Sequence, residues 1–225
     1  MREPRFYVYK CVVDDGGAPC IDNNILSLTI CKPYIRSTAR EGDLIFAFGS
    51  NNETPNNRLV YIAEVGRKFS GGKYFELDEF KNRGDCIYER NQSGKLVRRT
   101  DAKFHDFPTA WISDLGEDGR YPKANALVAS NFRYFGKAGT SSWKSTHPRL
   151  KELIEKLGQG HRVNFTQDLR SELLELKKGV WRRFPENKVL GRPMHTPDEH
   201  IDPDDGDVMK ICNTRCYYIA KKCRL

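Results

Sequence analysis

Short hydrophobic runs in the N-terminal part of the chain predict buried strands. Residues 44–48 (LIFAF) follow a turn at residues 42–43, and residues 59–63 (LVYIA) follow a polar loop. Runs of this length, rich in β-branched and aromatic residues, are typical of strands buried on both faces. Residues 6–13 predict a further buried strand, which ends in the turn-forming segment 14–17 (DDGG).

The pattern changes to helical spacing in the C-terminal part. Leucine and isoleucine recur three or four residues apart within residues 150–157, and again within residues 168–178. Strands first and helices later favour an α+β fold with a bent or barrel-like mixed sheet and peripheral helices. We expect one domain, 1–225, with a core at about 5–140 and a helical and C-terminal elaboration at about 147–225.

The charge balance points to a polyanionic partner. The formal net charge is +8, which suits phosphate backbones, although solubility alone is the alternative. No hydrophobic run approaches the length of a membrane-spanning helix, and no basic helix with an insertion face stands out. The N-terminus lacks the hydrophobic centre of a signal peptide. We therefore expect a cytoplasmic protein without membrane contact.

The turn at residues 42–43 and its two strands resemble those of the PUA-like superfamily, which includes the EVE, ASCH and YTH domains. More specifically, the runs 6–20, 26–51 and 57–65 are similar to the bacterial nucleotide-modification-associated domain of the second type. This resemblance implies a PUA-like core and a pocket beside it that holds a modified base of DNA. Relatives occur in bacterial systems that make, read or attack modified phage DNA.

A protein that acts on a base must flip it out of the stack, read its edge and hold the flanking phosphates. The candidate stacking residues are Tyr34, Trp111, Phe132, Tyr134 and Trp143. Trp143 looks least like a core residue, because polar residues surround it in sequence. The candidate edge-reading residues are Ser50, Asn51, Asn52 and Asn131, with turn chemistry as the alternative. The candidate phosphate contacts are Arg36, Arg40, Lys137, Lys144, Arg182 and Arg183, with solvated surface charge as the alternative.

Base excision needs a carboxylate or an amine near the sugar. A carboxylate stabilises the oxocarbenium character of the transition state or activates water, and an amine attacks directly. Asp14 and Asp15 follow the first core strand on a glycine-rich loop, where a plain turn is the alternative role. Lys32 is the candidate amine or a phosphate contact. Asp43 is expected to be structural, with its side chain capping its turn.

Metal and cofactor signals are weak. The chain has seven cysteines and no secretion signal, so disulfides are not expected. Cys212, Cys216 and Cys223 are either metal ligands or packing residues, and packing is favoured because no paired CxxC is present. Phosphate-binding loops and zinc-deaminase signatures are absent from the sequence. We therefore expect no cofactor and no metal.

Together these features favour a DNA glycosylase of antiphage defence. It would flip a hypermodified base, such as hydroxymethylated or glucosylated cytosine, and excise it. One alternative is a non-catalytic reader of modified bases that acts with a separate nuclease. The other is an RNA-binding PUA-like module, which would exploit unstacked bases and 2′-hydroxyl groups.

Overall fold

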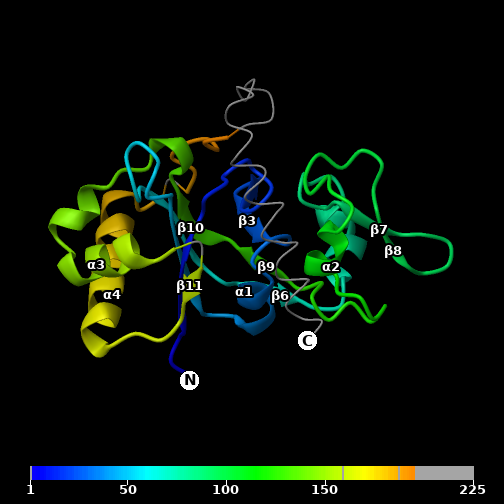
Figure 1. Ribbon diagram of the computed structural model, residues 1–225, viewed down its shortest axis with the longest axis horizontal. Helices are drawn as coiled ribbons and strands as arrows, with labels where there is room; N and C mark the ends of the chain where they lie inside the picture. Colours follow the sequence, from blue (N-terminus) through cyan, green and yellow to red (C-terminus); the bar gives the residue numbers. More distant parts are fainter. Residues whose placement is uncertain (1, 159, 187, 196–225) are drawn as a thin grey trace. The chain divides into compact units, whose positions relative to one another are not determined.

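The computed structural model describes residues 2–158, 160–186 and 188–195 (Figure 1). The chain forms two compact units, each assembled from segments distant in sequence. The described part of unit 1 lies within 2–12, 40–66 and 129–194, and that of unit 2 lies within 13–39, 67–128 and 195. Each unit has its own hydrophobic cluster. The prediction of a single domain stays a prediction.

Unit 1 contains a five-stranded mixed sheet among its described residues. Its strands are β1 (Phe6–Lys10), β4 (Leu44–Phe48), β5 (Leu59–Glu64), β10 (Asn131–Tyr134) and β11 (His161–Arg162). The order is β10-β5-β4-β1-β11, in which β1 and β4 run parallel and the other neighbours run antiparallel. Strands β10 and β11 lie at the edges, so the described strands of this sheet do not close into a barrel.

A buried carboxylate fixes the turn that leads into β4. The side chain of Asp43 is fully buried and accepts hydrogen bonds from the backbone N–H groups of Arg5 at 2.8 Å and Arg40 at 2.9 Å. Gly42 supplies the positive φ of +83° that the turn requires. The predicted structural role of Asp43 is confirmed.

Helices cover this sheet through leucine and isoleucine side chains. The helical segments of unit 1 are η3 (Gly136–Ala138), η4 (Ser142–Ser145), α3 (Pro148–Lys156) and α4 (Gln167–Arg183). Leu150 and Ile154 of α3 and Leu173 and Leu176 of α4 share one buried cluster with the strand residues. Helices α3 and α4 lie side by side in Figure 1. The helical spacing seen in the sequence therefore marks the faces that pack on the core.

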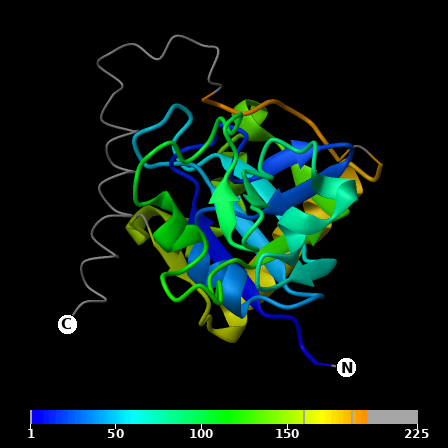
Figure 2. The same ribbon diagram turned by 90° about the vertical axis from the view of Figure 1, so that its right-hand side faces the viewer.

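Unit 2 combines a four-stranded sheet with a separate hairpin among its described residues. Its strands are β2 (Cys20–Asp22), β3 (Ile25–Leu28), β6 (Arg67–Phe69), β7 (Tyr88–Arg90), β8 (Leu96–Arg98) and β9 (Ala126–Ala129). The sheet order is β2-β3-β9-β6, and β7 pairs with β8. Its helical segments are α1 (Pro33–Thr38), η1 (Lys73–Glu76), η2 (Asp78–Phe80) and α2 (Ala110–Asp114), and Figure 2 gives a second view.

A buried polar cluster holds the interior of unit 2 together. Asp85 accepts hydrogen bonds from Ser27 at 2.5 Å, Thr29 at 3.1 Å and Tyr74 at 2.8 Å. The Nε atom of Arg83 lies 3.5 Å from the Asp85 carboxylate. Burial and the negative charge of Asp85 raise the pKa of the Tyr74 hydroxyl, so that it stays a donor. The buried charge of Asp85 is thus fully surrounded by donors.

These elements confirm the α+β fold class, with mixed sheets and peripheral helices. Among the residues that the structure describes, no helix has both the length and the hydrophobicity needed to cross a membrane.

Candidate functional site

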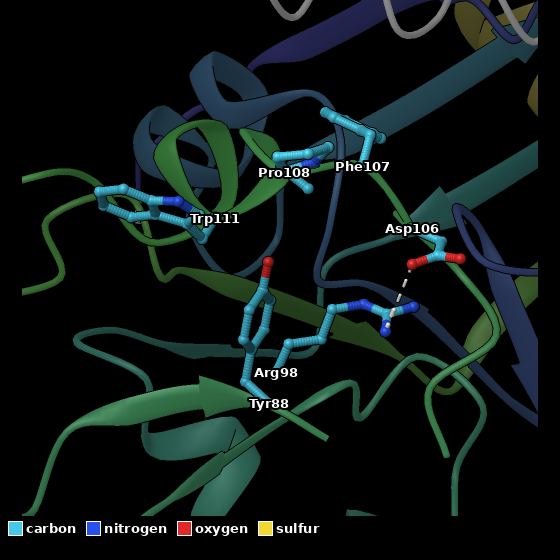
Figure 3. A pocket seen from close by; sticks show the side chains of 7 residues that line it. Tyr88, Arg98, Asp106, Phe107, Pro108 and Trp111 are labelled. Atoms are coloured by element: carbon cyan, nitrogen blue, oxygen red, sulfur yellow. Dashed lines mark ion pairs between the residues drawn. The ribbon is translucent and has the colours of Figure 1, made fainter. Parts of the chain in front are cut away.

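A pocket of about 410 Å³ lies beside α2 in unit 2 (Figure 3). Strand β7 contributes Tyr88, strand β8 contributes Arg98, and α2 contributes Trp111. The remaining lining residues are Asp106, Phe107, Pro108 and Ala110. The hairpin and the segment that leads into α2 therefore bring aromatic, cationic and acidic side chains to one pocket.

Trp111 is the aromatic residue of this pocket with the most accessible ring. Its relative exposure is 43%, whereas that of Tyr88 is 1%. A tryptophan left this exposed offers a ring face on which a planar ligand can stack. Trp111 was predicted from the sequence as a candidate stacking residue, and in the structure its side chain is exposed.

Arg98 brings a partly exposed cationic side chain to the pocket. Its Nη2 atom donates to the carbonyl oxygens of Ala102 at 2.7 Å and Phe104 at 3.0 Å, and its Nη1 atom lies 3.7 Å from the carboxylate of Asp106 (Figure 3). Its Nε atom is buried and has no acceptor among the described residues. A buried donor without an acceptor carries a desolvation cost of about 1–3 kcal/mol. The part of Arg98 that a ligand could reach is therefore Nη1, on the side of the exposed Asp106.

A chain of hydrogen bonds leads from the pocket wall to a cysteine. The Tyr88 hydroxyl donates to Oδ2 of Asp114 at 2.9 Å, and Nδ1 of His105 lies 2.7 Å from the same oxygen. On the other side of the ring, Nε2 of His105 lies 2.9 Å from Sγ of Cys31. Burial, together with the negative charge of Asp114, raises the pKa of Tyr88 and keeps its hydroxyl protonated. A thiol, an imidazole and a carboxylate are therefore linked in sequence.

Arg36 fixes the backbone around this chain and is not a phosphate contact. Its guanidinium is fully buried and donates to the carbonyl oxygens of Cys31 at 2.6 Å, Lys123 at 2.7 Å and Asn125 at 2.8 Å. Its Nη2 atom lies 3.7 Å from Oδ1 of Asp114. Burial lowers the pKa of Arg36, and the charge of Asp114 opposes that shift. The prediction that Arg36 meets DNA is wrong, because its donors face the protein interior.

Two further predicted residues lie close to Cys31 in sequence. Cys31 and Lys32 have positive φ angles of 54° and 41°, and α1 begins at Pro33. Lys32 is half-buried at the start of α1, and Tyr34 in the first turn is 50% exposed. Neither lines the pocket. Their predicted roles as amine and stacking residue stay predictions.

The predicted carboxylates occupy a tight loop in unit 2. Asp15 accepts a hydrogen bond from the backbone N–H of Gly17 at 2.9 Å, which is the turn chemistry weighed as its alternative. Asp14 is buried, and its backbone exchanges hydrogen bonds with His195: Asp14 N–H donates to Nδ1 at 3.2 Å and His195 N–H donates to the Asp14 carbonyl at 2.8 Å. Their catalytic roles stay predictions.

The asparagine-rich loop of unit 1 holds a buried lysine that sequence reasoning missed. The ammonium of Lys10 donates to Oδ1 of Asn51 at 2.9 Å and to Oδ1 of Asn57. Burial lowers the pKa of Lys10 to about 8, and the positive charge of Lys144 adds to the shift. The only sequence signal was a lysine at the end of an apolar strand. Asn51 therefore already serves the interior through its oxygen.

The other polar candidates of unit 1 make contacts at the surface. Ser50 Oγ accepts from the backbone N–H of Asn52 at 3.1 Å, as in an ordinary turn. Asn131 donates to Glu64 at 3.1 Å and accepts from the indole of Trp181 at 3.0 Å. Both Asn52 and Asn131 remain exposed, so their predicted contacts with a base edge stay predictions.

Three aromatic candidates of unit 1 are buried and cannot stack on a base. Phe132 and Tyr134 have no exposed surface, because β10 packs both side chains into the interior. Trp143 is 5% exposed, packs against Phe48 at a ring distance of 4.8 Å, and donates to the Asn57 carbonyl at 3.2 Å. The prediction of an exposed loop tryptophan is wrong. Its polar sequence neighbours face outward on a short helical turn while the indole fills the core.

The remaining basic candidates lie at the surface of unit 1. Arg40, Lys137, Arg182 and Arg183 are exposed. Lys144 contacts Asn56 at 2.9 Å and Glu155 at 3.3 Å. Phosphate contact by these residues stays a prediction.

In the described part of the chain, no group of three or more histidine, cysteine or acidic residues has the geometry to hold a metal ion. Cys212, Cys216 and Cys223, the weighed metal ligands, lie outside the described residues.

Comparison with known proteins assigns the chain to a family. The family described as nucleotide modification associated domain 2 matches residues 3–199. The chain belongs to this family, as the sequence resemblance predicted. No curated protein and no solved structure matches the chain significantly. The family places the chain in the context of nucleotide modification.

Proposed function

We propose that this protein binds DNA that carries a modified base and holds the flipped base in the pocket of unit 2. A pocket lined by both the exposed Trp111 and the cationic Arg98 is the observation that carries this proposal. A volume of about 410 Å³ falls within the range of ligand-binding pockets, roughly 300–1,000 Å³. It accommodates a single nucleobase with a substituent, and the family context supports a modified nucleotide as the ligand.

The pocket chemistry suits recognition of a base outside the duplex. Stacking of a base on an aromatic ring contributes about 1–3 kcal/mol and tolerates every base. Nη1 of Arg98, which lies 3.7 Å from the exposed carboxylate of Asp106, would donate to a carbonyl or ring nitrogen of the base. The net charge of +8 supports contact with the flanking phosphates.

The proposed reaction is excision of the base as a DNA glycosylase. Water adds to C1′ of the sugar, the C1′–N bond breaks, and the base leaves with a proton. Asp106 is the carboxylate of the pocket, and its side chain is 88% exposed beside Arg98. A carboxylate in this place would stabilise the developing charge on the sugar or activate the water. Asp15 is the second candidate, because the sequence predicts it as a catalytic carboxylate on the glycine-rich loop after the first core strand.

The setting we propose is bacterial defence against phages with modified DNA, in the cytoplasm. A non-catalytic reader that acts with a separate nuclease is the second candidate function. The guanidinium of Arg98 and the ring of Trp111 would serve binding whether or not a reaction follows, which is the observation that favours this second function. An RNA-binding module is the third.

Incubation with matched duplexes tests the proposal. Unmodified, hydroxymethylated and glucosylated cytosine duplexes are incubated with the protein and then treated with alkali, which breaks the strand at abasic sites. We expect breaks that require both the protein and the modification. Asp106→Asn is expected to abolish them while binding persists, and Asp15→Asn tests the second carboxylate. Asp118→Asn is the matched control, because Asp118 also pairs with an exposed arginine, Arg120, at 3.0 Å.

The outcomes separate the candidate functions. Intact DNA with tight, modification-dependent binding supports the reader. Preference for single-stranded RNA over modified DNA supports the RNA module. Covalent trapping of DNA on a lysine by borohydride would indicate that an amine is the nucleophile. Variants of Lys32 and Lys10 would then be compared to identify that lysine. Equal affinity for modified and unmodified DNA contradicts recognition of the modification.

A further inference from the structure

A cysteine, a histidine and an aspartate of unit 2 form a hydrogen-bonded chain that plays no part in the proposed excision. Sγ of Cys31 lies 2.9 Å from Nε2 of His105, and Nδ1 of His105 lies 2.7 Å from Oδ2 of Asp114. Both separations are hydrogen-bond distances, and they use opposite nitrogens of one ring. This is the order of groups that nucleophilic catalysis requires: a nucleophile, a base and a group that orients the base.

The surrounding residues hold each member of this chain in place. Asp114 is fully buried and receives the Tyr88 hydroxyl at 2.9 Å on the oxygen that faces His105. The guanidinium of Arg36 holds the Cys31 carbonyl at 2.6 Å and lies 3.7 Å from the other oxygen of Asp114. The positions of the thiol and the carboxylate are thus coupled through one buried cation.

The backbone at Cys31 departs from ordinary geometry. Cys31 follows β3 and precedes α1, and both Cys31 and Lys32 adopt left-handed φ angles, 54° and 41°. Non-glycine residues rarely adopt this conformation, and such positions cluster at functional sites. The sharp turn leaves Cys31 half-buried, whereas Cys11, Cys20 and Cys86 are buried. Among the described cysteines, only Cys31 combines partial exposure with an imidazole partner.

We infer that Cys31, His105 and Asp114 form a catalytic triad for acyl transfer, which takes esters, thioesters or amides as substrates. His105 removes the thiol proton, and the sulfur forms a bond to the carbonyl carbon. The leaving group departs with the proton from His105, which leaves a thioester on Cys31. Water then gives a proton to His105 and its hydroxyl to the carbonyl carbon. The acid is released and the thiol regains its proton.

The neighbouring pocket indicates which substrates fit. Tyr88 lines the pocket and also bonds to Asp114, and the ring of Phe107 lies 5.5 Å from the ring of His105. The triad residues do not line the pocket, but two of its lining residues contact them, so a substrate held in the pocket would lie next to the triad. If the proposed function holds, an acylated nucleobase is the substrate within this class. The triad itself does not rest on that function, so its test contains no DNA.

Thiol reactivity is the first test. The protein is treated with iodoacetamide at pH about 6.5, where an ordinary thiol is almost fully protonated, and alkylation of Cys31 is followed by peptide mass spectrometry. We expect Cys31 to react at least about tenfold faster than glutathione, because His105 takes the proton. His105→Gln is expected to remove this advantage. His161→Ala is the control, because His161 is an exposed histidine of unit 1.

Acyl transfer is the second test. p-Nitrophenyl acetate is expected to give an acetyl adduct on Cys31 that the wild type clears faster than His105→Gln does. Cys31→Ala should show no adduct at that position. Asp114→Asn tests the orienting carboxylate, and circular dichroism checks that the buried substitution leaves the protein folded. Alkylation of Cys31 no faster than that of glutathione, or an adduct whose clearance is the same in His105→Gln, would overturn the assignment.

Discussion

The hydroxyl of Tyr88 donates a hydrogen bond to the carboxylate of Asp114 at 2.9 Å, while the Tyr88 side chain lines the pocket. One residue thus belongs both to the proposed base-binding site and to the support of the proposed triad. Its ring serves the first and its hydroxyl serves the second. The two roles can therefore be separated by a substitution that removes only the oxygen.

Tyr88→Phe is the variant that separates them. The ring remains, so the affinity for modified DNA is expected to change less than about twofold. The lost hydrogen bond loosens Asp114 and with it His105, so alkylation of Cys31 is expected to slow several-fold. Binding titrations and alkylation rates on the same preparation measure both effects. An equal loss in both measurements would mean that the hydroxyl serves the pocket directly.

Lys10 predicts a pH dependence of stability in unit 1. Its pKa is about 8 in the folded protein and 10.5 when unperturbed, so the unfolded chain binds more protons between these values. Stability from this group is present above pH 10.5 and is lost as the pH falls through about 8. As the pH rises across that window, the wild type is expected to gain about 1–3 kcal/mol of unfolding free energy relative to Lys10→Met.

Urea denaturation of both proteins at several pH values measures this gain. Parallel curves for the wild type and Lys10→Met would contradict the lowered pKa of Lys10.

The buried cluster around Asp85 predicts a large stability effect. Asp85→Asn removes the buried ionic partner of Arg83 and leaves only the more exposed Asp22, 3.8 Å away. Breaking a buried pair in this way is expected to cost about 3 kcal/mol of unfolding free energy. Asp118→Asn removes an exposed partner of Arg120 and is expected to leave the unfolding midpoint unchanged. Similar midpoints for the two variants would show that the Asp85 cluster contributes little.

Exposed arginines predict a non-specific contribution to DNA binding. Arg182→Gln removes one candidate phosphate contact at the end of α4. Affinity for modified and unmodified duplexes is expected to fall by the same factor, and the slope of log K against log salt is expected to decrease by roughly one. Arg120→Gln, an exposed arginine of unit 2, is the control. A loss confined to the modified duplex would assign Arg182 to base recognition.

The strands could be predicted from the sequence because their hydrophobic runs are buried on both faces. The run at residues 44–48 coincides with β4, and the run at 59–63 falls within β5. The helical spacing of leucine and isoleucine predicted α3 and α4, because these side chains form the face of each helix that packs on the core. Trp143 was mispredicted because its polar neighbours in sequence face solvent while its ring turns inward. Polar sequence neighbours indicate that a segment lies at the surface. A single side chain on a short helical turn of that segment can still point into the core.

The candidate site was harder to predict, because its residues meet only in three dimensions. Cys31 lies 74 positions from His105 in sequence, and no motif connects them. Arg36 was predicted to lie at the surface because most arginines are exposed. Its guanidinium instead donates hydrogen bonds to backbone carbonyl oxygens in the interior. Trp111 was named from its residue type alone. Its place in a pocket with Tyr88 and Arg98 depends on how α2 meets strands β7 and β8 in three dimensions, which no local sequence pattern reports.

The affinity of Trp111→Ala for modified DNA tests the central claim most directly. Fluorescence anisotropy compares duplexes with hydroxymethylated and unmodified cytosine for the wild type, Trp111→Ala and Tyr34→Ala. Tyr34, 50% exposed against 43% for Trp111, is the other exposed candidate stacking residue of unit 2 and lies outside the pocket lining. We predict that the wild type prefers modified DNA. The affinity for modified DNA is expected to fall about tenfold in Trp111→Ala and to be retained in Tyr34→Ala. Unchanged affinity and preference in Trp111→Ala would contradict base binding in this pocket.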